Sequence, residues 1–274
     1  MQIEDKPYLV VEQKAIPSQY LKRQVIVDCY LPKNITDPKK MSLLLINDGQ
    51  DLADMHFSSL LNTLFSNDQL TPLFCIGLHT GRERKNEYGT AYVLDFEKRG
   101  AKAADYQQFI LMELLPFIQN AYAIEHFKQK AVCGFSLGGL SAIDTVWNHP
   151  EAFSIAGVFS GSLWWRTKNL NEGYNEATDR IMHKKIRDGL FREGLKFYFT
   201  TGSMDETADR NNNGVIDSID DTEALITELK LQGYSSDNIA YINYHDGKHD
   251  VATWGRAMPA FLEWGWGASK SNAV

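Results

Sequence analysis

Cysteine is scarce in this sequence, with three residues in 274 and no C-x-x-C pair. Cys29, Cys75 and Cys133 each lie inside an apolar run, which predicts three buried thiols and excludes a disulfide scaffold. Long apolar runs are absent as well, because no segment reaches the roughly eighteen uncharged residues of a membrane span. The sequence thus fits neither a disulfide-rich nor a membrane-spanning class.

Basic residues are outnumbered, since 28 Lys and Arg face 35 Asp and Glu for a net charge of −7. This balance argues against nucleic acid as a partner. The N-terminus carries acids where a signal peptide is basic, and no apolar segment follows, so a cytoplasmic protein without a membrane partner is expected. The oligomeric state is left open.

Repeats, low-complexity tracts and linkers rich in proline, glycine or serine are missing too. The composition, 43% hydrophobic and 23% charged, is that of a globular protein. The length is within reach of one large domain, and the sequence predicts a single α/β domain over residues 1–274.

Two kinds of hydrophobic pattern alternate along the chain, and they predict strands separated by helices. We expect a mostly parallel sheet with helices on both faces and an antiparallel N-terminal edge, because the first two strands have no helix between them. The helix over 103–123 is expected to kink at Pro116. The expected strands are 7–14, 23–31, 42–47, 72–79, 130–135, 154–161, 196–202 and 239–245, and the expected helices are 55–65, 103–123, 138–148, 176–190, 222–231 and 251–264.

The most informative motif is a G-x-S-x-G pattern between an expected strand and an expected helix, with Ser136 at its centre. In a nucleophile elbow the flanking glycines, here Gly134 and Gly138, allow a turn too tight for Cβ atoms. The turn also places the serine at a helix N-terminus, where backbone N–H groups favour a developing oxyanion. Ser136 is therefore the candidate nucleophile.

A serine nucleophile needs a base that an acid orients, and in α/β hydrolases the chain order is Ser, acid, His. We assign the base to His249, which lies on a loop before the last helix, rather than to His245 at the end of a strand. Gly247 between them argues against a helical zinc-binding pair. The acid is assigned to Asp205, in the loop after strand 196–202, with Glu206 as its alternative.

The surroundings of the elbow suggest further roles. In this fold a second oxyanion donor comes from the loop after the third strand, so the backbone N–H of Gln50 is expected to act with that of Leu137. Trp164 and Trp165 follow a strand end on the same side of the sheet, where they either wall a substrate pocket or pack in the core.

Several segments together resemble the "Putative esterase" family, which includes enterochelin-type siderophore esterases, feruloyl esterases, esterase D and mycolyltransferases. The resemblance runs from about residue 20 to 265 and rests on GFSLGG, HPEAFSIAGVFSGSLWW, INDGQD, RERKNEYG and GKHDVATW. It implies the α/β-hydrolase fold, a triad matching Ser136, Asp205 and His249, and oxyanion donors at Gln50 and Leu137. The acidic insertion at 209–221 departs from the better-known members.

These residues predict a serine carboxylesterase that forms an acyl-enzyme on a small-molecule ester, with no organic cofactor. Two alternatives remain open. The same triad supports acyl transfer to a hydroxyl acceptor, and a hydrolase-fold module can bind without catalysing. The sequence does not identify the ester.

The acidic charge is concentrated, since seven of the acids and one arginine fall within 205–223. Residues 209–220 match a twelve-residue EF-hand loop, with Gly214 at the sharp turn and Ile216 as the apolar anchor. A calcium ion with a structural role, ordering the nearby loop of Asp205, is predicted here. The expected ligands are Asp209, Asn211, Asn213, the Val215 carbonyl, Asp217 and Asp220.

Overall fold

A computed structural model describes residues 3–33, 35 and 37–268. Within this part of the chain nine strands form one sheet, in the order β1-β2-β3-β5-β4-β6-β7-β8-β9. The pairs from β1 to β5 along this order are antiparallel and the rest are parallel, so the predicted mostly parallel sheet with an antiparallel N-terminal edge is confirmed. The strands are β1 (Ile3–Lys6), β2 (Leu9–Ser18), β3 (Arg23–Pro32), β4 (Ser42–Asn47), β5 (Leu73–Leu78), β6 (Lys130–Phe135), β7 (Ile155–Phe159), β8 (Lys196–Met204) and β9 (Ile239–Lys248).

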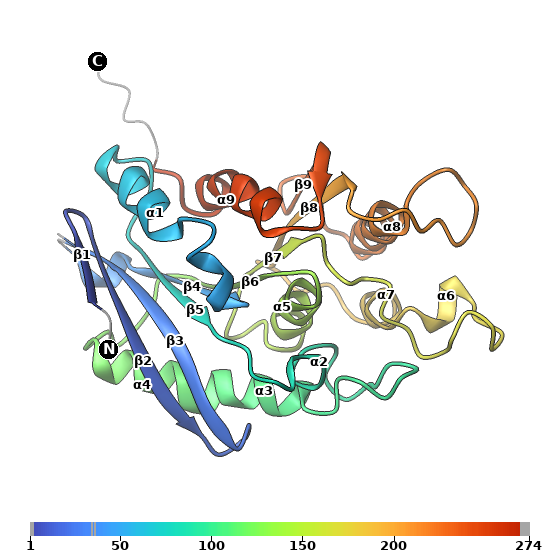
Figure 1. The fold of residues 1–274 in the computed structure, drawn as a ribbon, viewed down its shortest axis with the longest axis horizontal. Coiled ribbons are helices and arrows are strands. Elements are labelled where there is room, and N and C mark those ends of the chain that lie inside the picture. Colours follow the sequence, from blue (N-terminus) through green and yellow to red (C-terminus); the bar gives the residue numbers. More distant parts are fainter. Residues whose placement is uncertain (1–2, 34, 36, 269–274) are drawn as a thin grey trace.

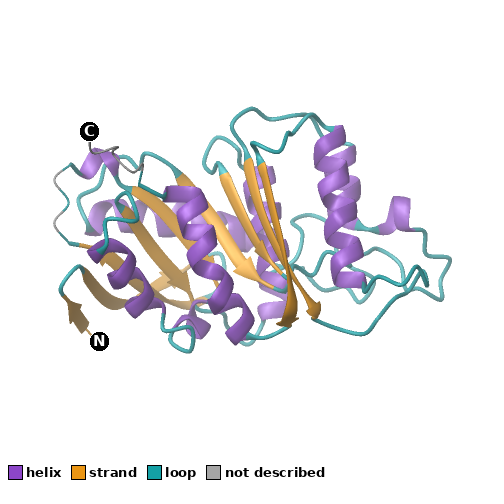
Figure 2. Ribbon diagram, turned by 90° about the horizontal axis from the view of Figure 1, so that it is seen from above, coloured by secondary structure: helices purple, strands orange, loops and turns teal. Residues whose placement is uncertain are grey.

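Helices cover both faces of the sheet (Figures 1 and 2). They are α1 (Phe57–Ser66), α2 (Arg84–Glu87), α3 (Ala103–Phe109), α4 (Leu115–Ala121), α5 (Leu137–Asn148), α6 (Glu176–Asp179), α7 (Ile181–Arg187), α8 (Asp217–Leu231) and α9 (Val251–Trp266), with 3₁₀ turns at Pro38–Lys40 and Gly49–Leu52. The helices α1 and α9 lie on one face, and α3, α4 and α5 lie on the other (Figure 1).

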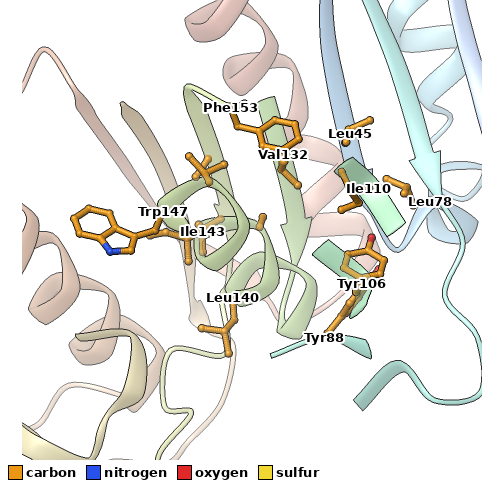
Figure 3. Packing of buried hydrophobic residues seen from close by; sticks show 14 of the residues in the cluster. Leu45, Leu78, Tyr88, Tyr106, Ile110, Val132, Leu140, Ile143, Trp147 and Phe153 are labelled. Carbon is orange, nitrogen blue, oxygen red and sulfur yellow. The ribbon is translucent and has the colours of Figure 1, made fainter. Parts of the chain in front are cut away.

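The side chains of the central strands alternate between two hydrophobic clusters, one on each face. Leu43 and Leu45 of β4 point into the cluster under α3, α4 and α5, whereas Leu44 and Ile46 point toward α1 and α9. Figure 3 shows part of the first cluster, which includes Ile143 and Trp147 of α5 and Val132 of β6. Burial on both faces explains why these strands are continuously apolar in sequence.

The long helix expected over 103–123 is differently built. It consists of α3, a π-helical segment at Ile110–Leu114, and α4. Pro116 lies in the first turn of α4, just after the π-helical segment. The hydrogen bond that proline cannot donate is therefore missing at this junction rather than inside a continuous α-helix. Apolar periodicity does not distinguish a π-helical turn from an α-helical one, so the sequence did not reveal it.

The loops that follow the parallel strands meet at one edge of the sheet, because the carboxyl ends of parallel strands point the same way. Loops after β4, β6, β7, β8 and β9 carry all the candidate catalytic residues. In the described residues no helix combines the length and apolarity that crossing a bilayer requires.

Candidate active site

Ser136 lies between β6 and α5 in a strained backbone conformation, with φ 53° and ψ −121°. The two flanking glycines make this turn possible. A Cβ atom on Gly134 would lie 2.5 Å from the Gly138 backbone, and one on Gly138 would lie 2.6 Å from Asp48 Oδ2. A strained non-glycine residue at a strand-to-helix turn is the geometry of a nucleophile elbow.

The Ser136 hydroxyl has a serine neighbour from the end of β7. Ser136 Oγ lies 3.3 Å from Ser162 Oγ, and the Ser162 N–H donates to the Ser136 carbonyl at 3.0 Å. The Ser136 N–H donates to the carbonyl of Phe159 at 2.9 Å. These backbone hydrogen bonds connect the elbow to the end of β7 and to the loop that follows it.

His249 lies between β9 and α9, and Asp205 lies directly after β8, as the sequence predicted for both loops. The distance from His249 Nδ1 to Asp205 Oδ1 is 4.0 Å, longer than a hydrogen bond. The Asp205 side chain is fully buried, its Oδ2 accepts the Gly202 N–H at 3.0 Å, and its Oδ1 has no hydrogen-bond partner within the described residues. Oδ1 is therefore available to the imidazole.

Burial lowers the pKa of His249 from its ordinary value, because desolvation disfavours the imidazolium. The charge of Asp205 opposes this effect, and that of Arg84 adds to it. The imidazole also packs edge-on against Trp254, with ring centroids 5.1 Å apart. A neutral imidazole at neutral pH is the form that can accept a proton.

Two polar side chains fix the end of β4 and the loop after it, one by a bond to the elbow and the other by a bond to α2. Asn47 Nδ2 donates to the Gly138 carbonyl at 2.8 Å. Asp48, whose side chain is 2% exposed, accepts two hydrogen bonds of 2.7 Å from Arg84. Arg84 of the RERKNEYG segment thus binds Asp48, whereas Glu87 of the same segment pairs with Arg23.

The two expected oxyanion donors are the backbone N–H groups of Leu137, in the elbow, and of Gln50, in the loop after β4. Leu137 is the first residue of α5, and the first N–H groups of a helix have no intrahelical acceptor. Gln50 lies in the 3₁₀ turn after Asp48, which has a left-handed backbone with φ 61°. The Gln50 side chain accepts the Thr80 N–H at 3.1 Å. The expected oxyanion donor is the backbone N–H of Gln50, not this side chain.

A cavity of about 270 Å³ brings the three candidate triad residues together, since Ser136, Asp205 and His249 all line it. Trp164 lines it as well. Trp165 does not: it is 1% exposed, and its ring packs 4.8 Å from the Arg99 guanidinium and against Gly89. Of the two tryptophans, the structure places one on the cavity wall and the other in the core.

The acidic loop at 209–220 is held by hydrogen bonds between its own side chains and amide groups. The Asp209 carboxylate accepts the N–H groups of Asn213 and Gly214, at 3.1 and 2.9 Å. Asn213 Oδ1 accepts the Val215 N–H at 2.8 Å. The side-chain amides of Asn211 and Asn213 donate to Asp220, at 3.0 and 3.2 Å. Four of the six expected ligand residues thus surround one small region of the loop.

Arginines already neutralise part of this acidic segment. Arg210 contacts Asp217, whose Oδ1 accepts its N–H at 2.9 Å, and both Arg210 and Arg180 pair with Asp221. Within the described residues no three His, Cys, Asp or Glu side chains are grouped as metal ligands. Any ion here therefore depends on amide and carbonyl oxygens as well as carboxylates, which is usual for calcium.

Several residues of the site were not predicted from the sequence. Ser162 and Ser218 line the cavity, and so does Glu206, which entered only as an alternative triad acid. Ser162 had a recognisable signal, a polar residue just after the apolar strand beside the elbow strand. Arg84 had none, because its partner Asp48 is distant in sequence.

Comparison with known proteins agrees with the fold. The model of the family "Putative esterase" matches residues 18–264. The uncharacterized protein YjcH of Bacillus subtilis is 22% identical over 253 residues, which cover 89% of this chain and 92% of that protein. The iron(III) enterobactin esterase of Escherichia coli is 28% identical over 156 residues, which cover 55% of this chain and 33% of the esterase.

Among solved structures, the enterochelin esterase of Shigella flexneri superimposes with a TM-score of 0.70 at 22% identity, over 93% of this chain and 57% of that one. The chain thus spans a third to just over half of the length of these two siderophore esterases. The family match, by contrast, covers most of the chain, so the protein belongs to the "Putative esterase" family of carboxylic ester hydrolases with the α/β-hydrolase fold.

Proposed function

We propose that the protein hydrolyses carboxylic esters through Ser136, His249 and Asp205. The observation that carries the proposal is the strained Ser136 at the start of α5, in one cavity with the imidazole of His249, which is 38% exposed, and the buried carboxylate of Asp205. Nucleophile, base and orienting acid in this arrangement are the parts of a Ser-His-Asp triad.

In the first half-reaction His249 takes the proton of Ser136 Oγ as the oxygen attacks the ester carbonyl. Asp205 Oδ1 accepts from the imidazole and stabilises the imidazolium. The tetrahedral oxyanion lies between the N–H groups of Leu137 and Gln50, with the N-terminus of α5 adding its dipole. His249 then protonates the departing alcohol, and water releases the acyl group by the same steps in reverse.

Catalytic hydrogen bonds often shorten when substrate binds. The 4.0 Å between His249 Nδ1 and Asp205 Oδ1 and the contact of Ser136 with Ser162 are therefore compatible with the proposed triad. The substrate proposed is a small-molecule ester held against Trp164. The siderophore esters named for the relatives are one class to test, beside short acyl, aromatic and sugar esters.

Fluorophosphonate labelling followed by intact-mass measurement tests the nucleophile. We expect one adduct on the wild type and none on Ser136→Ala. Replacing Ser136 or His249 by alanine should lower kcat by about 10³-fold or more and leave Tm nearly unchanged. A wild type without adduct, or an equal adduct on Ser136→Ala, would refute the triad.

We further propose that loop 209–220 holds a calcium ion in a structural role, with no organic cofactor in the reaction. Support comes from the convergence of Asp209, Asn213 and Asp220 and from the open turn at Gly214, with φ 85°. The ion would fix the segment that leads from Asp205 to α8, and no step of the hydrolysis passes through it.

A further inference from the structure

Two residues on the wall of the catalytic cavity have no part in the proposed hydrolysis. Glu206 follows Asp205 directly, and Ser218 lies in the first turn of α8. Both line the same cavity as Ser136 and His249.

Ser218 is the unusual member of the pair. It is 8% exposed, and its Oγ has no hydrogen-bond partner within the described residues. Burying a hydroxyl without a partner is unfavourable, so such groups generally have a ligand or water to bind. The residue lines the cavity while its unpaired Oγ is enclosed, so a rotation about χ1 would give this hydroxyl a partner in a group bound there.

The charge beside Ser218 is negative. Burial and the charges of Asp217, Asp221 and Asp205 raise the pKa of Glu206, and a hydrogen bond from the Ser218 backbone opposes this shift. Among the described residues that line the cavity, none is a lysine or arginine. The wall thus offers the Glu206 carboxylate and, after rotation of its side chain, the Ser218 hydroxyl to whatever binds there.

Three arginines around this part of the molecule have carboxylate partners. Arg210 pairs with Asp217 and Asp221, and Arg180 also pairs with Asp221. Arg84, close enough to His249 to lower its pKa, is held bidentately by Asp48.

Two more arginines pack around Trp164. Arg99 pairs with Asp95, and Arg166 stacks on Phe96 and Tyr174. Neither lines the cavity.

We propose that Glu206 and Ser218 form a specificity subsite for a positively charged, hydrogen-bond-donating group of the ester, such as a primary ammonium. The proposal rests on the hydrolase function proposed above and adds the substrate class. An ammonium has three donors, which the Glu206 carboxylate and the Ser218 oxygen can accept. An anionic substituent in the same place would face the negative charge of Glu206.

A series of p-nitrophenyl esters matched in length tests this. The acyl groups are 6-aminohexanoate (cation), heptanoate (neutral) and hemiadipate (anion), and kcat/KM is measured for each at pH 7. We expect the cationic ester to exceed the anionic one by about tenfold or more. Inhibition of p-nitrophenyl acetate hydrolysis by n-butylammonium, n-butanol and butyrate should follow the same order.

In Glu206→Gln the cation-to-anion ratio should fall close to one, and in Ser218→Ala it should fall severalfold. Glu223→Gln is the matched control, since it removes one exposed acid of α8 that does not line the cavity. It should keep the wild-type ratio. A wild type that hydrolyses all three esters equally, or favours the anion, would overturn the subsite alone.

A second outcome concerns the alternative triad acid. If Glu206→Gln lost activity about 10³-fold on every ester while Asp205→Asn did not, Glu206 would orient His249 and the subsite proposal would be wrong. If no ester showed hydrolysis that depends on Ser136, the proposed function would fail, and the subsite with it.

Discussion

Asp48 is a buried carboxylate that forms an ion pair with Arg84. Arg84 donates two hydrogen bonds to it, and its side chain is 2% exposed. We therefore expect Arg84→Ala to destabilise the protein by about 3–5 kcal/mol, because it leaves a buried charge unpaired. Urea unfolding measures this. Arg82→Ala, which removes an exposed arginine two residues away, should change stability by less than about 0.5 kcal/mol.

Hydrolysis should persist into mildly acidic solution. The base must be neutral, and burial lowers the pKa of His249 below its usual 6.5. The acid limb of kcat/KM should therefore have its midpoint below pH 6.5. Asp205 raises this pKa, so the residual activity of Asp205→Asn should show a midpoint at still lower pH. A wild-type midpoint above 6.5 would contradict the assignment of His249.

At the level of elements, the helix that follows His249 begins with a side-chain cap. Asp250 Oδ1 accepts the Thr253 N–H at 2.8 Å at the start of α9. Asp250→Ala should cost about 1 kcal/mol of stability in thermal or urea unfolding.

This hydrogen bond lowers the pKa of Asp250, so the cap's contribution is present above the ordinary carboxyl pKa and lost as pH falls through the lowered one. Asp246→Ala removes only a surface ion pair with Arg256 and should cost less than Asp250→Ala at pH 7. Equal losses in the two variants would argue against the cap.

Local pattern was sufficient for the elements that the core defines. The strands at 42–47 and 130–135 were predicted with their observed bounds, because each has an apolar interior and is followed by a turn. The region 176–190 was predicted as one helix but forms α6 and α7, since Arg180 is extended and pairs with Asp221. Pairings between distant residues do not appear in local periodicity.

The candidate site shows the same difference between features of local sequence and contacts between distant residues. The loops that carry Ser136, Asp205 and His249 were predicted correctly, because each follows a recognisable strand. The neighbours of these residues were not, since the contacts of Ser162 with Ser136 and of Arg84 with Asp48 depend on how separate strands lie side by side. The helix α8 starts at Asp217 rather than 222, which draws Ser218 into the cavity wall.

For the whole molecule, calcium should act on stability more than on chemistry. If loop 209–220 binds the ion, millimolar calcium should raise Tm, and chelation should lower activity partly while Ser136 remains labelled by fluorophosphonate. Asp209→Ala should abolish the shift in Tm, and Glu223→Gln should preserve it. Titration calorimetry of chelated protein that shows no binding at millimolar calcium would exclude the site.

The sheet order has a consequence for refolding. Ser136, Asp205 and His249 follow β6, β8 and β9, which lie with β7 at one end of the parallel part of the sheet. Parallel partners are joined by long crossovers, and such non-local pairing forms slowly. Helical signal can return early in refolding, but the three side chains lie near one another only after β6 to β9 have all paired. The rate at which hydrolysis recovers during refolding therefore measures how fast strands β6 to β9 complete their pairing.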